Sequence, residues 1–572
     1  MAVSEDIRSI IRKFAIKNAL DYGKADVGSV LGKSIQAAKG TPIPELKASV
    51  QEIINEVNAL DKADLEKAYA PFEKEFEQRA KETAERTAKP RINVEGAVDG
   101  HVFTRFPPEP GGYIQIGNAK QCLLSEELAN FYKGAIFLYF DDTNPEKCKQ
   151  EYVDGIKRDT AWLGVKFSKE YYASDSIEKI YDAGRRLIRQ NDAYACMCSG
   201  DIVKEKRADM SECQHRAQDP AENLKIFEEM LSGKYDAGQV IIRLKGDMKS
   251  ENATFRDPTI FRIKKASHFR QGGKYIVWPT YHVNTPVIDN INGVTDVIRG
   301  KEYEIWGDIN KKMLKSLDLK APRFHYEARL RIKEVATAKR EIRAFLKDGL
   351  VKTWDDPRLG TIAALRRRGI QAQAIRDFVL RFGLSLTDAM MSIDMLLAEN
   401  KKHIDPIAKH LFFVGSPVKL SIGNANAMNA KLKLHPSNDY GYREYEVGSA
   451  FYISGSDAKS IKSGDTIRLK DLMDIKVSET GNEILGETGP ATQKDKIIQW
   501  VPQNDCIECT VLVPGSIMDE HGKYNPDSLK AVQGYVEGYA RKLNEHDIVQ
   551  FERFGYCILD DKEKMQFIFI SK

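Results

Sequence analysis

Four potential metal ligands lie close together near the middle of the chain. Cys196 and Cys198 form a Cys-x-Cys pair, and after fourteen further residues Cys213 and His215 form a Cys-x-His pair. Three thiolates and one imidazole suit the tetrahedral coordination that Zn²⁺ prefers, and the short loop lets both pairs converge. We therefore expect a structural zinc site here. Two buried free thiols beside an incidental histidine are the alternative.

The segment RFPPEPGGYIQIGNAK, from Arg105 to Lys120, joins a predicted strand to a predicted helix. Val102–Thr104 and Phe106 have strand composition, prolines and glycines then break the chain, and a helix-forming run starts at Asn118. Glycines allow close backbone approach, and a helix N-terminus offers free N–H groups and partial positive charge. This arrangement is typical of a site that binds nucleotide phosphate.

Carboxylates follow a second predicted strand. The apolar run AIFLYF, residues 135–140, leads directly into Asp141, Asp142, Thr143, Asn144 and Pro145. Open α/β sheets bind ligands at the C-terminal ends of their strands, so these carboxylates are candidate ligand contacts. A turn followed by a helix cap is the alternative.

Length and composition indicate several globular domains. The chain has 572 residues, of which 42% are hydrophobic and 30% charged, and 87 basic against 83 acidic residues give a net charge of +4. No apolar run approaches the roughly 18–20 residues of a membrane span, and the N-terminus has no signal-peptide pattern. We expect a cytoplasmic protein that uses its eight cysteines as metal ligands or reduced thiols.

The motifs together resemble those of class I aminoacyl-tRNA synthetases, in the glutamyl/glutaminyl branch. That family carries R-F-P-P-E-P-x-G-Y-L-H-I-G-H-A-K where this chain has Arg105–Lys120, and L-R-F-D-D-T-N-P where it has residues 138–145. Further matches are W-D-D-P-R at residues 354–358 and L-R-R-R-G at residues 365–369. The resemblance runs over nearly the full length.

The resemblance implies an ATP site. Gln115 and Asn118 replace the two histidines of the first signature, and Lys339 keeps the lysine of the second, where Ala338 replaces a serine. These three residues, Gln115, Asn118 and Lys339, are the implied catalytic groups. The implied ATP contacts are Pro108, Gly111, Gly112, Gln115, Gly117, Asn118, Lys339 and Arg340.

The resemblance also implies an amino-acid site formed by Arg105, Asp141, Tyr281 and Arg299. Asp141 would accept hydrogen bonds from the α-ammonium group. Arg299 stands where glutamyl enzymes carry an arginine and glutaminyl enzymes commonly carry a smaller residue, and an arginine fork binds a carboxylate strongly. Two cations facing one amino acid favour glutamate over glutamine. A surface ion pair of Arg299 with Glu302 or Glu304 is the alternative.

The implied reaction joins L-glutamate to tRNA(Glu) through a glutamyl-adenylate, with ATP and Mg²⁺ as substrate. Some members of the family hold zinc in the insertion that receives the tRNA acceptor end, which fits the Cys/His cluster. Changes at Gln115, Asn118, Tyr139, Trp306 and Ala338 motivate the alternative of a catalytically silent tRNA-binding paralogue. A glutaminyl-tRNA ligase is a third interpretation, which Arg299 and the cysteine cluster disfavour. Charging of tRNA(Gln) as well stays open, and we expect a monomer.

We expect a multidomain fold around an α/β Rossmann-like catalytic domain. The C-terminal third shows short alternating strands typical of all-β domains, here resembling paired anticodon-binding barrels. Its Tyr440, Tyr442, Arg443 and Tyr445 could stack on unpaired bases, or serve the core. The expected order is an N-terminal helical appendage at 1–93, the catalytic halves at 94–190 and 276–345 around an acceptor-binding insertion at 191–275, a helical stem-contact domain at 346–410 and β-barrels at 411–572.

Two charged stretches have ambiguous roles. Glu66–Lys89 reads as a solvated helix that leads into a linker before Pro90, or as an appendage that contacts tRNA or a partner. The cluster Arg366–Arg368 is a candidate phosphate contact or a solvated helix face.

Overall fold

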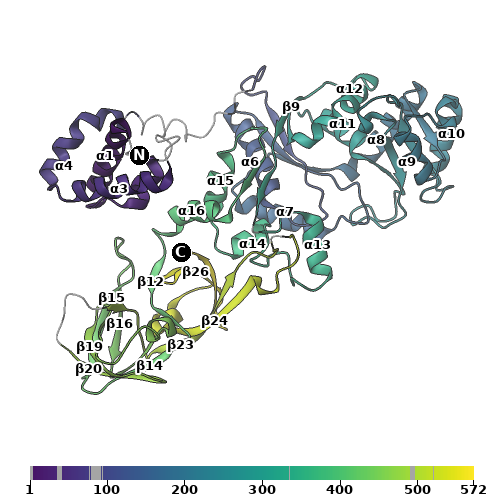
Figure 1. Ribbon diagram of the computed structural model, residues 1–572. Coiled ribbons are helices and arrows are strands. Elements are labelled where there is room, and N and C mark those ends of the chain that lie inside the picture. Colours follow the sequence, from purple (N-terminus) through teal and green to yellow (C-terminus); the bar gives the residue numbers. More distant parts are fainter. Residues whose placement is uncertain are drawn as a thin grey trace. The chain divides into compact units, whose positions relative to one another are not determined.

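The computed structural model comprises two compact units, Met1–Pro90 and Arg91–Lys572, which we describe separately (Figure 1). It describes residues 4–34, 42–76, 78, 92, 94–333, 335–489, 496–519 and 521–572. Of the charged helix predicted over Glu66–Lys89, residues 79–89 lie outside the described part of the chain.

The N-terminal unit is helical, as expected. Its elements are α1 (Glu5–Tyr22), α2 (Val27–Ser34), α3 (Ile43–Asn58), α4 (Lys62–Tyr69) and the 3₁₀ turn η1 (Ala70–Phe72). Apolar residues spaced three or four apart, such as Ile11 on α1 and Val50 and Ile53 on α3, are fully buried between the helices. Arg8 of α1 and Glu52 of α3 pair at 2.8 Å across the same helices.

The second unit starts with a parallel sheet of β1 (Phe103–Phe106), β2 (Ala135–Phe140) and β3 (Lys169–Tyr172). Strands β8 (Asp296–Gly300) and β9 (Arg323–Glu327) form a second parallel pair. Thr295, just before β8, donates its N–H to the carbonyl of Phe103 at 2.9 Å, so β8 lies beside β1. The near-continuous apolar sequence of β2 suits a parallel strand that helices cover on both faces.

The helices of this α/β part follow the strands. They are α6 (Ile116–Phe131), α7 (Gln150–Trp162), α8 (Ile177–Arg189), α11 (Tyr281–Ile291) and α12 (Gly307–Ser316), with 3₁₀ turns η2 (Ala173–Ser176) and η5 (Lys301–Trp306). Between its halves lies an antiparallel sheet of β4 (Ala193–Cys196), β5 (Ile241–Leu244), β6 (Thr259–Ile263) and β7 (Val277–Pro279). The insertion that contains this sheet also contains α9 (Gly200–Ala208), α10 (Pro220–Leu231), η3 (Gln214–Ala217) and η4 (Ala253–Phe255). The insertion therefore ends on the strand that leads into Tyr281.

A mainly helical stretch follows. It contains α13 (Lys339–Lys347), α14 (Ile362–Arg367), α15 (Ala372–Leu380) and α16 (Ile393–Ile404), together with the short parallel pair β10 (Leu330–Ile332) and β11 (Ala389–Met391). The segment Tyr326–Ile332 is thus divided between β9 and β10. Ile375 and Leu396, on α15 and α16, belong to the hydrophobic core that also holds α6.

The C-terminal part consists of two barrel-like seven-stranded sheets, and one interrupts the other. The first sheet is continuous in sequence. It consists of β14 (Val418–Ile422), β17 (Ala450–Ile453), β18 (Thr466–Leu469), β19 (Met473–Glu479), β20 (Glu483–Thr488), β21 (Lys496–Ile498) and β22 (Val501–Pro502). The second combines β12 (Lys409–Leu411) and β13 (Phe413–Gly415) with β23 (Cys506–Pro514), β24 (Leu529–Glu537), β25 (Ile548–Phe551), β26 (Gly555–Asp561) and β27 (Gln566–Ser571). The first sheet is therefore inserted into the second.

A two-stranded hairpin, β15 (Met428–Lys433) and β16 (Tyr442–Val447), accompanies the first sheet, and α17 (Gly455–Ala458), η6 (Pro526–Ser528) and η7 (Gly538–Lys542) complete the elements described. Tyr440 and Tyr442 are exposed on this hairpin, whereas Tyr445 is buried. Arg443 is also buried and pairs with Glu537 at 2.7 Å. Of the four proposed base contacts, Arg443 and Tyr445 thus belong to the core.

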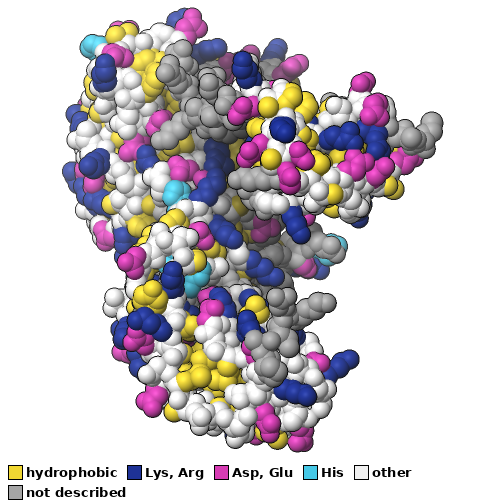
Figure 2. Space-filling model, turned by 90° about the vertical axis from the view of Figure 1, so that its left-hand side faces the viewer, with side chains coloured by type: hydrophobic (Ala, Val, Ile, Leu, Met, Phe, Trp, Pro, Cys, Tyr) yellow, Lys and Arg dark blue, Asp and Glu magenta, His cyan; other side chains and the backbone are white. Residues whose placement is uncertain are grey.

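The surface carries both charges in near balance. Acidic and basic side chains are interspersed over the face in Figure 2, in keeping with the small net charge. Within the described residues, no helix combines the length and the apolar character that crossing a membrane requires.

Candidate functional site

A cavity of about 900 Å³ opens at the C-terminal ends of the parallel strands. Residues from β1, from the turn after β2 and from β8 line it together with the start of α6 and the segment before α13. This is where an open α/β sheet is expected to bind a ligand. The predicted site residues that line it are Arg105, Pro108, Gln115, Gly117, Asn118, Asp141, Tyr281, Arg299 and Lys339.

Three predicted ATP contacts are not among the residues that line this cavity. Gly111 and Gly112 pack beneath the turn instead: a Cβ at Gly112 would come within 2.9 Å of the Trp354 ring. Arg343, on α13, donates a hydrogen bond to the carbonyl of Gly111. Arg340 is exposed on α13. The two glycines therefore allow the turn to pack closely against Trp354 and Arg343.

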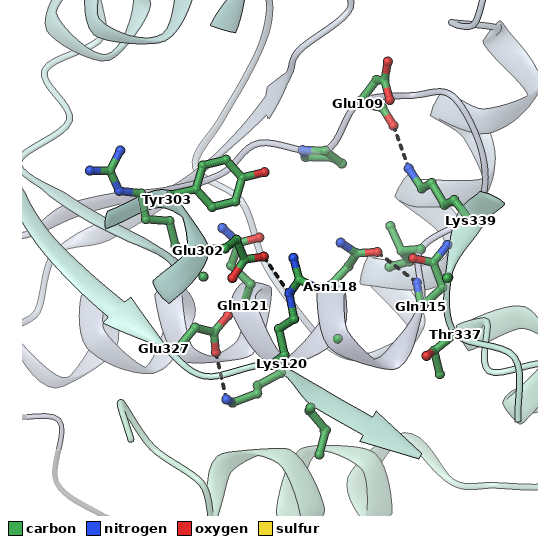
Figure 3. Close-up of a pocket in the computed structure, with 18 of the residues that line it drawn as sticks. Glu109, Gln115, Asn118, Lys120, Gln121, Glu302, Tyr303, Glu327, Thr337 and Lys339 are labelled. Carbon is green, nitrogen blue, oxygen red and sulfur yellow. Dashed lines mark hydrogen bonds and ion pairs between the residues drawn. The ribbon is translucent and has the colours of Figure 1, made fainter. Parts of the chain in front are cut away.

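The start of α6 uses Gln115 and Asn118 for its own capping. Asn118 Oδ1 accepts a hydrogen bond from the N–H of Gln115 at 3.1 Å (Figure 3). Gln115 Nε2 donates to the carbonyl of Tyr113 at 2.6 Å. Side chains that bond first-turn N–H groups stabilise a helix start. The Asn118 amide nitrogen has no hydrogen-bond partner among the described residues, so it keeps a donor for a ligand in the cavity.

Lys339, the first residue of α13, lines the same cavity and lies beside Gln115 in Figure 3. Its ammonium donates to the carbonyl of Glu109 at 3.1 Å, which ties α13 to the proline-rich turn (Figure 3). Burial lowers the pKa of Lys339, while Glu109 acts against this change. A buried ammonium that a neutral carbonyl holds is suited to binding an anion.

Arg105 is fixed by a carboxylate that sequence analysis did not identify. Asp289, on α11, accepts hydrogen bonds from Arg105 Nε at 3.0 Å and from Nη2 at 3.2 Å. Burial alone would lower the pKa of Arg105, but the Asp289 carboxylate outweighs it and raises the pKa above its usual value. Arg105 Nη1 is buried and has no hydrogen-bond partner among the described residues. The only hint in the sequence was a single acidic residue in the otherwise uncharged stretch VNTPVIDNI.

Arg299, on β8, is a buried cation without a counter-ion. The residue is 3% exposed, and it forms no ion pair within 4.0 Å among the residues that the structure describes. Arg299 Nη2 donates to the Tyr326 hydroxyl at 2.9 Å, and Nε has no hydrogen-bond partner in the described part of the chain. Glu302, one of the two partners in the alternative interpretation, pairs with Arg329 at 3.0 Å instead. Asp289 acts on Arg299 only from a distance, since Arg299 is among the charges that lower the pKa of that carboxylate. A buried charge without a direct partner is costly, so the site favours an anionic ligand.

Asp141 completes the group that surrounds this end of the cavity. Its carboxylate accepts hydrogen bonds from Asn284 at 2.8 Å and from Thr143 at 2.9 Å. Burial raises the pKa of Asp141, while these two hydrogen bonds act in the opposite direction. A carboxylate with remaining acceptor capacity in a cavity suits a ligand ammonium group.

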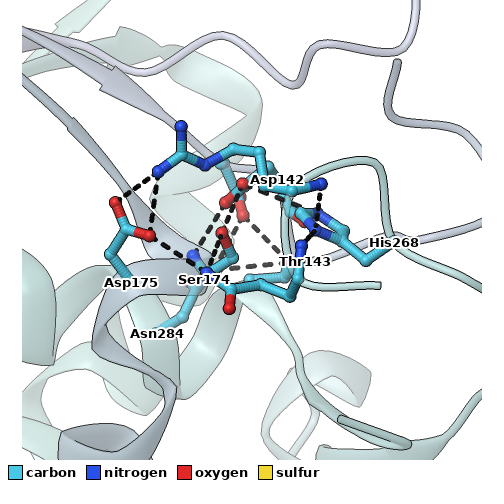
Figure 4. A network of polar contacts seen from close by, with 9 residues as sticks. Asp142, Thr143, Ser174, Asp175, His268 and Asn284 are labelled. Atoms are coloured by element: carbon cyan, nitrogen blue, oxygen red, sulfur yellow. Dashed lines mark hydrogen bonds and ion pairs between the residues drawn. The ribbon is translucent and has the colours of Figure 1, made fainter. Parts of the chain in front are cut away.

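The neighbouring Asp142 points away into a buried network (Figure 4). It accepts hydrogen bonds from the Ser174 N–H at 2.8 Å and the Ser174 hydroxyl at 2.7 Å. His268 Nδ1 accepts N–H bonds from Arg270 and Gln271, so its proton lies on Nε2, 2.9 Å from the Asp142 carbonyl. Burial raises the pKa of Asp142 to about 7. This network fixes the backbone that carries Asp141.

The four predicted metal ligands converge in the insertion. Their ligand atoms all lie within 4.8 Å of one another, with Cys196 Sγ and Cys213 Sγ 3.8 Å apart and Cys198 Sγ and His215 Nδ1 3.4 Å apart. A tetrahedral ion with Zn–S bonds of about 2.3 Å requires S···S edges of about 3.8 Å. The donor set and its spacing therefore fit one zinc ion.

Comparison with known proteins assigns nearly the whole chain. The family described as tRNA synthetases class I (E and Q) matches through its catalytic domain at residues 101–406 and two anti-codon binding domains at 408–488 and 497–560. The glutamate–tRNA ligase of Nitrosopumilus maritimus is 36% identical over 99% of this chain and all of its own length. Those of Sulfolobus acidocaldarius and Pyrococcus furiosus are each 35% identical, over 98% and 99% of both chains.

Proposed function

Because the chain belongs to the class I tRNA synthetases of the glutamate and glutamine family, we propose that it is a glutamate–tRNA ligase. L-glutamate and ATP would form glutamyl-adenylate with release of pyrophosphate. The terminal adenosine hydroxyl of tRNA(Glu) would then attack the activated carbonyl. Full-length similarity to archaeal relatives that carry this name supports the proposal.

The buried charge of Arg299, which has no direct ion-pair partner among the described residues, is the observation that carries this choice of substrate. Arg299 and Arg105 line the cavity as cations, and Asp141 lines it as an anion. Asp289 already offsets Arg105. Glutamate brings two carboxylates and one ammonium, so its γ-carboxylate would supply the missing counter-charge of Arg299. Glutamine has a neutral amide and would leave that charge unpaired.

In this proposal Arg105 and Arg299 bind carboxylates, Asp141 binds the α-ammonium group, and Tyr281 forms a wall of the same pocket. ATP with Mg²⁺ would lie along the start of α6. Asn118 and Gln115 would offer uncharged donors to its oxygens, and Lys339 would exchange the Glu109 carbonyl for a phosphate. Catalysis would consist of positioning and electrostatic stabilisation, without a covalent enzyme intermediate. The contacts assigned to ATP are Pro108, Gly111, Gly112, Gln115, Gly117, Asn118, Lys339 and Arg340.

Zinc would be held by Cys196, Cys198, Cys213 and His215 in a structural role. All four ligands come from the protein, which leaves no open coordination position for catalysis. When bound, the ion would cross-link β4 to the loop that contains η3 and so stabilise the insertion.

The domains would divide the work as expected from the sequence. The insertion at 191–275 would receive the acceptor end, 346–410 would contact the stem, and the sheets from 411 onward would bind the anticodon. The N-terminal region at 1–93 would be an appendage of the catalytic halves. We further propose a cytoplasmic monomer that acts on tRNA(Glu), and tRNA(Gln) is the second substrate to test.

Glutamate-dependent ATP–pyrophosphate exchange tests the proposal. Purified protein should catalyse exchange with glutamate and not with glutamine, with tRNA(Glu) added if it is required. Background exchange beside retained tRNA binding would instead identify a silent paralogue. Exchange with glutamine alone would identify a glutaminyl-tRNA ligase.

A further inference from the structure

The two arginines of the amino-acid site are anchored by different chemistry. A carboxylate holds Arg105 through two hydrogen bonds, and this anchor also offsets the guanidinium charge. Arg299 is held by the hydroxyl of Tyr326 at 2.9 Å, which is a neutral acceptor. The first anchor fixes position and removes net charge, whereas the second fixes position alone.

We propose that Tyr326 is a specificity-determining positioning residue, which aims the Arg299 guanidinium at the side-chain carboxylate of glutamate without forming an ion pair with it. This inference rests on the proposed function. Tyr326 does not line the cavity, so it would act through Arg299 rather than touch the substrate.

Strand pairing brings the residues of this anchor together. Parallel strands β8 and β9 pair in a register that sets Arg299 opposite Tyr326 and Val297 opposite Phe324. The guanidinium carbon lies 4.2 Å from the centre of the Phe324 ring and 5.1 Å from that of Tyr326. Aromatic rings attract a guanidinium without neutralising it, and they exclude water. The two rings and one hydroxyl therefore restrict the side chain that would otherwise sample many rotamers.

The neutral anchor matters because a charged one would remove the selectivity. A carboxylate in place of the Tyr326 hydroxyl would pair with Arg299 in the absence of substrate, and glutamate would have to displace it. Because the Tyr326 phenol is neutral, the carboxylate that pairs with Arg299 is supplied only by the bound ligand. A misplaced Arg299 guanidinium could no longer form the two parallel hydrogen bonds that distinguish a carboxylate from an amide.

Tyr326→Phe tests this directly, since it removes one oxygen and keeps both rings. We expect the KM for glutamate to rise about 3- to 10-fold, the range of one net hydrogen bond, and the preference for glutamate over glutamine to fall. The KM for ATP and the melting temperature should stay within error of wild type. Tyr132→Phe is the matched control: it also removes a hydroxyl that takes part in a hydrogen bond, here with the Val94 N–H at 3.1 Å, and because Tyr132 does not line the cavity its loss should change neither the glutamate KM nor the preference.

An unchanged glutamate KM and preference in Tyr326→Phe would overturn the inference, and so would an equal rise in the KM values for glutamate and ATP. Calorimetric titration with glutamate alone separates this inference from the proposed function. Background exchange with glutamate binding that still weakens in Tyr326→Phe would overturn the ligase activity and retain the anchor. Absence of glutamate binding to wild type would overturn both.

Discussion

Asp289 and Arg105 form a two-point ion pair in which neither side chain is more than 4% exposed. The pair connects β1 to α11, and its cation lines the proposed amino-acid site. Removing one member of such a pair leaves an uncompensated buried charge, which generally costs more than the pair contributes.

Asp289→Asn should therefore destabilise the protein and weaken glutamate binding together. We expect the free energy of unfolding to fall by about 3–5 kcal/mol, measured by chemical denaturation. Asp99→Asn breaks the exposed pair with Lys133 and should cost no more than about 1 kcal/mol. Equal small effects of both substitutions would contradict the assigned importance of the buried pair.

Arg299→Ala should raise the KM for glutamate by about 100-fold or more and leave the KM for ATP nearly unchanged. The reason is the loss of a charge-assisted, two-point contact to a carboxylate. Arg299→Lys keeps the charge without the planar fork and should recover only part of the binding. Steady-state exchange kinetics provide both constants, and a parallel rise in them would argue against a role at the carboxylate.

Gln115→His combined with Asn118→His should raise kcat for exchange by about 10-fold or more. Both wild-type groups donate as neutral amides, and charged donors stabilise phosphate oxygens more strongly. The glutamate KM serves as the internal control, since neither side chain belongs to the proposed amino-acid pocket. A lower kcat in the double variant would show that capping of α6 by these amides matters more than charge.

Asp142 should make stability depend on pH in a defined window. Its pKa is raised to about 7 by burial, against about 3.9 in an unfolded chain. The folded state thus binds the proton more tightly, so stability falls as pH rises from about 4 through about 7 and levels off about one pH unit above. Between pH 5 and pH 7, wild type should lose about 2 kcal/mol more than Asp142→Asn. Urea denaturation at several pH values measures this difference, and parallel curves would refute it.

Protein purified without chelator should contain close to one equivalent of zinc by elemental analysis. Cys198→Ser should lose most of that zinc, because serine is a poor ligand for the ion. Cys506→Ser is the matched control, since Cys506 lies in the C-terminal sheet, far along the chain from the cluster. If wild-type protein contained no zinc, or if both variants lost zinc equally, the proposed zinc site would be contradicted.

Much of the fold could be predicted from the sequence, because the hydrophobic pattern and the turn residues determine secondary structure locally. The strand over 135–140, the helix after the Pro/Gly turn and the all-β C-terminal part are confirmed, as is the family. Residues that resemble the family's motifs also meet in one cavity, as Arg105 and Arg299 do from separate strands.

The side chains that hold Arg105 and Arg299 in place could not be predicted, since they are brought close only by the tertiary structure. Nothing local links Asp289 to Arg105, 184 positions away. The Arg366–Arg368 cluster shows the same limit, because its charge pattern suggested a solvated or phosphate-binding face. In the structure Arg367 pairs with Asp560 at 2.8 Å and Arg368 is buried. Arg366 pairs with Asp159 at 3.5 Å, so distant partners decide the roles of Arg366 and Arg367.

The interrupted sheet at the C-terminus has a consequence for synthesis on the ribosome. Strands β12 and β13 leave the exit tunnel early, but their partners β25 and β24 follow only after the entire inserted sheet has emerged. The last strand, β27, lies between β26 and β23, so the final residues close the structure that began some 160 residues before. This sheet can therefore be completed only after β27 has left the exit tunnel, and until then the early strands β12 and β13 lack a finished sheet.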